Sequence, residues 1–191
     1  MYIYGASATL VDVTASGNTG LLGGAICANS SANVIVSGGI ISGNTASGTN
    51  NGGGGIMATI NATVDVIGAT VAGNTAEKGG GIWAHTSTTI NLSNTIISGN
   101  TAPIGSGADI WVANGAVIHI AGSNTLGVVE GSSGYVTISS GASINLISGI
   151  APGTSGGITV LEGGCTINGV SVPGGTYTSI TSDSGSDIFV S

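Results

Sequence analysis

The residues that could carry chemistry are few in this sequence. Eight acidic residues are spread along the chain, Lys78 is the only basic residue, and the two histidines, His85 and His119, stand alone. Calcium-dependent polysaccharide lyases need clustered aspartates and a base, and glycoside hydrolysis needs two carboxylates within about 10 Å of each other. The acids do not cluster at the spacing that either chemistry requires. The sequence therefore predicts a protein that is not an enzyme and needs no cofactor.

Two patterns bear on metal and redox chemistry. Cys27 and Cys165 lie far apart and belong to no Cys-x-x-Cys or Cys/His spacing, so we expect two unpaired small residues. Asp183 and Asp187, in the pattern Asp-x-Gly-x-Asp, resemble a calcium loop. Two carboxylates make a weak site, so a polar turn is the favoured interpretation and no metal site is predicted.

The composition excludes several classes of partner. The chain has 191 residues, the size of one domain, with 41% hydrophobic residues, 5% charged residues and 37 glycines. A net charge of −7 with a single basic residue cannot neutralise phosphates, so nucleic acid is excluded. No apolar run reaches the roughly 18 residues of a spanning helix, so direct membrane insertion is not expected. Many Ser, Thr and Asn residues indicate an extracellular location, with the chain a mature fragment of a larger exported protein.

Two short motifs recur along the first three fifths of the chain. Gly-Asn-Thr occurs at 17–19, 43–45, 73–75 and 99–101, so its asparagines are spaced by 26, 30 and 26 residues. A glycine-rich motif ending in isoleucine occurs at 23–26, 53–56 and 79–82, with a looser copy that ends at Ile110. Between the motifs lie alternating apolar triplets, which are typical of half-buried strands. These spacings indicate a repeat of about 26 to 30 residues.

Each repeat contains three short strand signals separated by Gly, Ser or Asn corners, with no amphipathic helical stretch. Without crossover helices, each strand can pair only with its counterpart in the next copy. The sequence thus predicts an all-β, single-stranded parallel β-helix (a solenoid), with three short strands per coil and about seven coils. We expect long-coil repeats in residues 1–114, and a shorter-coil continuation with a C-terminal cap in residues 115–191. A separate small β domain in the second region is the alternative.

Stacked repeats place equivalent residues in columns along the axis. Isoleucines at equivalent positions predict one inward column of like aliphatic side chains. Asparagines of the Gly-Asn-Thr motif predict a second, in which each side-chain amide bonds to the next one and satisfies a sharp corner. The isoleucine column is Ile26, Ile56, Ile82 and Ile110, and the asparagine ladder is Asn18, Asn44, Asn74 and Asn100.

An outward apolar stripe follows from the same alignment. The residues after the isoleucine column are Cys27, Met57, Trp83 and Trp111, which alternation places on the outer side of the same sheet. An exposed apolar stripe of this kind indicates a binding surface for a sugar ring or for a second copy of the chain. The alternative is that a loop or tail, such as the inserted segment 47–51, covers it.

A second outward row consists of threonines, Thr19, Thr45, Thr75 and Thr101. Regular threonine rows can match an ice lattice, but such surfaces need two parallel rows on one flat face. The companion column here is mixed and contains Ile40, Thr70 and Ile96. Ice binding is therefore kept as an alternative function.

The paired motifs carry a family resemblance. Gly-Gly-Ala-Ile at 23–26 with Ile-x-x-Asn at 41–44, repeated as Gly-Gly-Gly-Ile at 79–82 with Ile-x-x-Asn at 97–100, resembles the repeats of polymorphic outer membrane proteins. The resemblance covers roughly residues 9–112 and implies a right-handed β-helix of the autotransporter passenger type, at a bacterial surface. This chain has Ile or Val where the family has Phe, Gly in place of the motif Ala in two copies, and no carboxy-terminal barrel.

These observations together favour a non-enzymatic structural or adhesive segment. We expect its partners to be a second copy or a glycan on a host surface. Because the chain starts almost directly in a coil, end-to-end stacking into a fibre is a further hypothesis, through the unpaired edges of the end strands.

Overall fold

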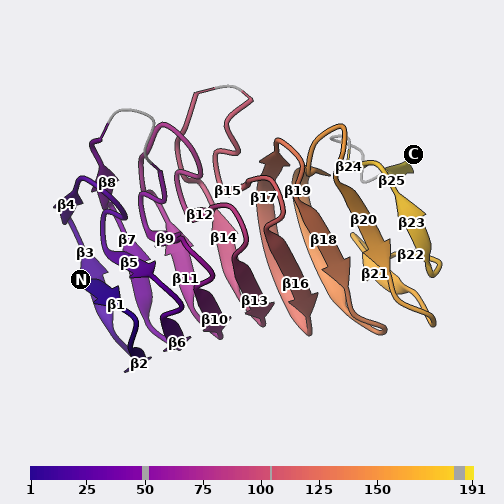
Figure 1. The fold of residues 1–191 in the computed structure, drawn as a ribbon. Helices are drawn as coiled ribbons and strands as arrows, with labels where there is room; N and C mark the ends of the chain where they lie inside the picture. The colour runs from indigo at the N-terminus through magenta and orange to yellow at the C-terminus, as the bar shows by residue number, and fades with distance from the viewer. Residues whose placement is uncertain (49–51, 104, 183–187) are drawn as a thin grey trace.

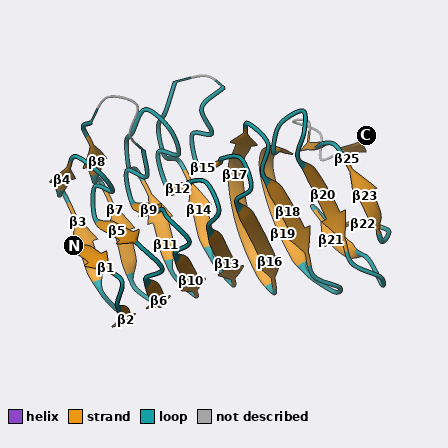
Figure 2. Ribbon diagram, in the orientation of Figure 1, coloured by secondary structure: helices purple, strands orange, loops and turns teal. Residues whose placement is uncertain are grey.

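The computed structural model describes residues 1–48, 52–103, 105–182 and 188–191. These residues form strands and loops without a helix, and the two termini lie at opposite ends of an elongated stack (Figures 1 and 2). The stack is a parallel β-solenoid of about six turns, close to the right-handed β-helix predicted. The all-β solenoid is therefore confirmed, with about six turns in place of the expected seven.

Three strands follow one another in each long coil, and each pairs in parallel with its counterpart in the next coil. The first position is occupied by β1 (Tyr2–Tyr4), β5 (Ile26–Asn29), β9 (Ile56–Ala58), β12 (Ile82–Ala84) and β15 (Ile110–Val112). The second position is occupied by β2 (Ser7–Val11), β6 (Asn33–Ser37), β10 (Thr63–Ile67), β13 (Thr89–Ser93), β16 (Val117–Ala121), β18 (Tyr135–Ile138) and β20 (Gly157–Val160). The third is occupied by β3 (Thr14–Ser16), β7 (Ile40–Ser42), β11 (Thr70–Ala72) and β14 (Ile96–Ser98).

The first coils also contain a short fourth ladder that was not expected. Strands β4 (Thr19–Gly20) and β8 (Thr45–Ala46) pair in parallel, and isolated bridges continue this pairing from Thr45 to Thr75 and on to Thr101. The glycine-rich loops that follow need residues without a side chain. A Cβ atom on Gly54 would lie 2.3 Å from the carbonyl oxygen of Gly80, because the loops of neighbouring coils are in direct backbone contact.

The coil changes its course in the second half of the chain. Strands β17 (Ser123–Gly131) and β19 (Ser143–Ala151) each run through both the third position and the following first position. The asparagine corner and the glycine-rich loop are absent from these two strands, which shortens the coil. Val136 pairs with Ile158, as the shorter repeat predicts.

Antiparallel strands occupy the C-terminal end of the stack. Strand β21 (Cys165–Ile167) still pairs in parallel with β19, but its next partner, β22 (Val170–Val172), is antiparallel. Strand β23 (Gly175–Tyr177) lies antiparallel to β20, β24 (Ile180–Ser182) to β19, and β25 (Ile188–Val190) to β24. The parallel pairing therefore ends here, and the division of the chain into two regions stays a prediction.

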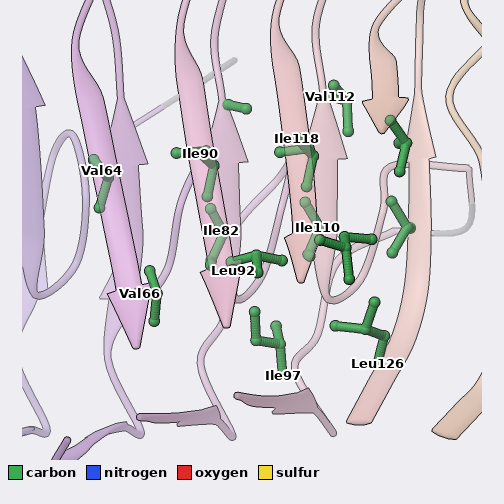
Figure 3. Packing of buried hydrophobic residues seen from close by; sticks show 14 of the residues in the cluster. Val64, Val66, Ile82, Ile90, Leu92, Ile97, Ile110, Val112, Ile118 and Leu126 are labelled. Carbon is green, nitrogen blue, oxygen red and sulfur yellow. The ribbon is translucent and has the colours of Figure 1, made fainter. Parts of the chain in front are cut away.

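The core is a set of aliphatic columns inside the coils. Ile56, Ile82 and Ile110 are fully buried and stand in register, and Figure 3 shows Ile82 and Ile110 among the side chains between the strands. The column continues to Val129 and Ile150 through the long strands. One continuous apolar core thus holds the coils together. Because the coils stack in register, their outward side chains also form regular rows.

Candidate functional site

The asparagine ladder uses its hydrogen-bonding groups inside the fold. Asn74 Nδ2 donates to Oδ1 of Asn100 at 2.9 Å and to the carbonyl oxygen of Ile41 at 2.9 Å, while its own Oδ1 accepts from the backbone and side chain of Asn44. Asn44 and Asn74 have no exposed surface. Asn18 begins the ladder by donating to Asn44. The buried side chains of Asn44 and Asn74 are therefore committed to the corner of the coil and leave no group free for a ligand.

Asp109 ends the ladder, which sequence reasoning missed. Its Oδ1 accepts from the backbone nitrogen and from Nδ2 of Asn100, at 3.0 and 2.8 Å, and its Oδ2 accepts from the backbone nitrogen of Val128 at 2.8 Å. The side chain is 4% exposed. A Cβ atom on Gly127 would lie 1.8 Å from Oδ2, so a larger residue there would displace the Asp109 carboxylate from this position. A carboxylate accepts at both oxygens and donates from neither, so it closes a chain of amide donors where no further asparagine follows.

The expected exposure of the apolar stripe is wrong. Cys27, Met57 and Trp83 are 1%, 4% and 5% exposed, and Trp111 is half-buried. The register is as predicted, with Cys27 beside Met57, Met57 beside Trp83, and Trp83 beside Trp111. These side chains lie on the outer side of the sheet but form a second, smaller hydrophobic cluster with Leu22. They are thus not an open binding surface.

Loops from neighbouring coils cover this second cluster. A Cβ atom on Gly52 would lie 2.7 Å from Cε3 of Trp83, so the backbone at Gly52 rests on the indole ring. Lys78 places Nζ 5.7 Å from the centre of the Trp111 ring, a cation–π contact that occupies the single basic side chain. Residues 49–51 of the inserted segment lie outside the described residues, as do Asp183 and Asp187. Sequence periodicity could not reveal the cover, because it aligns strands and does not show where a loop folds.

His85 lies at the edge of the same cluster. Its ring meets that of Trp83 edge to face, with centroids 4.8 Å apart, and its Nδ1 lies 3.4 Å from Oγ1 of Thr59. Burial, together with the nearby charge of Lys78, lowers the pKa of His85 below 6.5. Trp83 Nε1 is buried and has no hydrogen-bond partner among the described residues.

The two cysteines behave as packing residues. Both are free and buried, Cys27 in the second cluster and Cys165 in the main core. Burial raises the pKa of each thiol, which disfavours the reactive thiolate. Within the described residues, no three His, Cys, Asp or Glu side chains lie close enough together to hold a metal ion.

The outward face of the eight-stranded sheet is uncovered. In its parallel strands every outward side chain is exposed or half-buried. Its central row brings Asp65, Asn91 and His119 into register, and Asn91 Nδ2 donates to Oδ1 of Asp65. The row holds one carboxylate, so the paired carboxylates of a glycosidase are not brought together on this face.

The threonine row is aligned as predicted, through the ladder that joins Thr19, Thr45, Thr75 and Thr101. Its companion row alternates between threonine and isoleucine, with Ile40 beside Thr70 and Thr70 beside Ile96. The second regular threonine row that an ice-binding face needs is not formed by these residues.

A polar depression of about 220 Å³ lies where the long coils give way to the short ones. We call it the corner groove. It follows the corner after β13 and β16 and crosses the first residues of β14, β17 and β19. Its lining residues are Asn94, Thr95, Ile96, Ser123, Asn124, Thr125, Ser143 and Asn145.

Two of the lining residues hold the corner groove in shape. Asn124 is 4% exposed, its Oδ1 accepts from the backbone nitrogen and Oγ1 of Thr95, and its Nδ2 donates to the carbonyl oxygen of Ala121. Asn94 adopts a left-handed backbone with φ of 56°, and its Oδ1 accepts from the backbone nitrogen of Ser123. The sequence contained no signal for the groove, because it depends on the change of coil.

No family model, curated protein or solved structure matches this chain. The resemblance to polymorphic outer membrane protein repeats therefore rests on the motif residues alone. The described ranges contain no helix of the length and apolarity needed to span a membrane.

Replacing Asp109 by asparagine tests the end of the ladder. Asparagine has one acceptor oxygen, so it cannot accept from both Asn100 and Val128, and a buried donor is left unpaired. We expect a loss of about 1–3 kcal/mol in the free energy of unfolding, measured by thermal and urea denaturation. The matched control is Asp65→Asn on the outward face, where a change within about 0.5 kcal/mol is expected. Equal effects of the two substitutions would show that Asp109 has no special role.

The pKa of His85 predicts a pH dependence of stability. Because the folded pKa lies below the unfolded value of 6.5, the contribution to stability is fully present above pH 6.5 and is lost as the pH falls through that value toward the folded pKa. We expect the melting temperature to fall between about pH 7.5 and pH 5.5, and His85→Gln to flatten this fall. His119→Gln, at an exposed position, should leave the fall unchanged. The same pH profile in wild type and His85→Gln would contradict this account.

Proposed function

We propose that this chain is a non-enzymatic structural and adhesive segment of a protein exposed outside the cell, at a bacterial surface. The observation that supports this proposal is the uncovered outward face of the eight-stranded sheet, which runs along the stack from β2 to β20. Its rows consist mainly of uncharged hydroxyl, amide and aliphatic side chains. A flat face of this kind makes many weak contacts in parallel, which suits adhesion.

The interior supports the same proposal. The buried asparagines and Asp109 are used in hydrogen bonds that hold the coils together. Trp83 is covered by a loop, and Trp111 is half-buried beside Lys78. Groups able to contact a partner are thus on the outward rows. A solenoid fixes the distance between such rows at one coil, about 4.8 Å, which gives a stiff spacer with a regular surface.

A fibre is the second candidate. Strands β1, β2, β3 and β4 each pair on one side only, and the same end has a cavity of about 250 Å³ lined in part by Leu10, Val13 and Ile41. The other end carries antiparallel strands, so it does not repeat the parallel register that coil-on-coil stacking uses. This asymmetry places the fibre second. Sedimentation that shows one monomer mass at all concentrations would exclude it.

Adhesion can be measured with beads that carry the purified chain. We expect such beads to be retained under flow on bacterial or epithelial cell layers more than beads that carry albumin, because many copies act together. Excess soluble chain should compete with this retention. Beads that carry the heat-unfolded chain are the control for the folded rows. Retention no greater than that of albumin beads on every surface would contradict an adhesive role.

A further inference from the structure

The corner groove contains hydrogen-bonding groups that the fold does not use. The hydroxyl groups of Ser123, Thr125 and Ser143 and the side-chain amide of Asn145 make no hydrogen bond within the described part of the chain. They come from two neighbouring strands, β17 and β19, and line one depression. Asn44, Asn74 and Asn100 of the ladder differ from them, since their amides are fully paired and buried. Unpaired groups that meet in a depression can bind a ligand at no cost to the fold.

The four groups form two short rows. Ser123 lies beside Ser143 in register, and Thr125 lies beside Asn145 with Ile96 next in the same row. Successive positions along each row are about 4.8 Å apart, and the rows are separated by two residues of strand, about 6.6 Å. Donors and acceptors are thus distributed over a patch of the size of one sugar ring. Ile96 is 46% exposed and offers an aliphatic surface beside them.

The backbone around the groove is already paired. Strand β17 pairs with β14 and β19, and β19 pairs with β17 and β21. A peptide could not add itself as a strand here, because no sheet edge is open. Recognition must use side-chain hydroxyl and amide groups, which suit a ligand with many hydroxyl groups.

Charge narrows the class of ligand further. None of the residues that line the groove is charged, and the chain as a whole carries −7. An anionic polysaccharide would meet a repulsive field with no basic side chain to offset it. A neutral ligand meets no such barrier.

We propose that the corner groove binds one sugar unit of a neutral glycan, with Thr125, Asn145, Ser123 and Ser143 as hydrogen-bonding residues and Ile96 against the apolar face of the ring. This inference rests on the proposed adhesive function and names its ligand class. The volume of about 220 Å³ suits one sugar unit, with the rest of the glycan lying over the outer surface.

The first step of the test is an array of neutral and anionic oligosaccharides. The second step is NMR titration of the isotope-labelled chain with the oligosaccharides that bind on the array. If none binds on the array, chitotetraose and cellotetraose are titrated. We expect neutral probes to bind weakly, at roughly millimolar concentration, and to shift the amide signals of Ser123, Thr125 and Asn145. Tetragalacturonate, an anionic probe, should not shift them. Thr125→Val removes one hydroxyl with little change of shape and should weaken binding by roughly three- to tenfold. Asn145→Leu should act in the same direction.

The matched control is Thr159→Val, which makes the same change at an exposed outward position of β20. It should leave binding unchanged, and all three variants should keep the wild-type melting temperature. If Thr159→Val lost as much binding as Thr125→Val, the proposal would be overturned. The absence of shifts at the groove with every neutral probe would also overturn it.

The two proposals fail in different ways. If beads adhere but neutral oligosaccharides neither bind the groove nor compete, the groove proposal is overturned and the adhesive role stands. If neutral oligosaccharides bind the groove but beads do not adhere to any cell layer, the groove proposal is supported and the adhesive role is overturned.

Discussion

The fold depends on how each long coil satisfies the polar groups of a sharp corner that lies inside the stack. Asn44, Asn74 and Asn100 of the ladder each accept with Oδ1 from the preceding coil and donate with Nδ2 to the next acceptor of the ladder and to carbonyl oxygens nearby. A ladder of this kind needs an acceptor in every following coil, because otherwise its last amide is buried without a partner. Asp109 meets that need with a carboxylate. No asparagine corner follows Asp109 in the next coil. Strand β17 instead continues through the position that the asparagine corner occupies in the long coils.

The same requirement separates the inside of the coil from the outside. Inward aliphatic side chains are packed along the axis, and the inward asparagines are hydrogen-bonded to one another, so neither group is open to a ligand. Outward residues differ according to whether a loop covers them. The glycine-rich loops of the long coils cover Trp83 in the first-position row. They leave the third-position row open, because Ile96 in a long coil is 46% exposed, as Asn145 in a short coil is also exposed. Loop cover, more than polarity, therefore decides which outward row is available.

Periodicity was enough to predict the parts of the fold that repeat. Parallel in-register stacking converts a fixed sequence spacing into contact, so the column through Ile56 and Ile82 and the pairing of Val136 with Ile158 followed from the spacing alone. The candidate site was predictable only in part. The four stripe residues are in register, but their exposure depends on a loop path that spacing does not encode. Asp109 follows Asn100 by nine residues, which breaks the period, so nothing in the repeat marked it as the next member of the ladder.

A perfectly periodic solenoid also has a difficulty as a specific binder, because every coil presents the same row and no position is preferred over the next. Recognition of one ligand at one place requires a break in the period. In this chain the break is the change of coil after Asp109, where Asn124 fixes the corner around Thr95. The left-handed corner at Asn94 is shared with Gly68 and Gly122 in the neighbouring coils. The corner groove lies at that break, and its unpaired groups come from the strands that the break creates. Asp109, which ends the ladder, thus also marks the place at which the outward rows stop repeating from coil to coil.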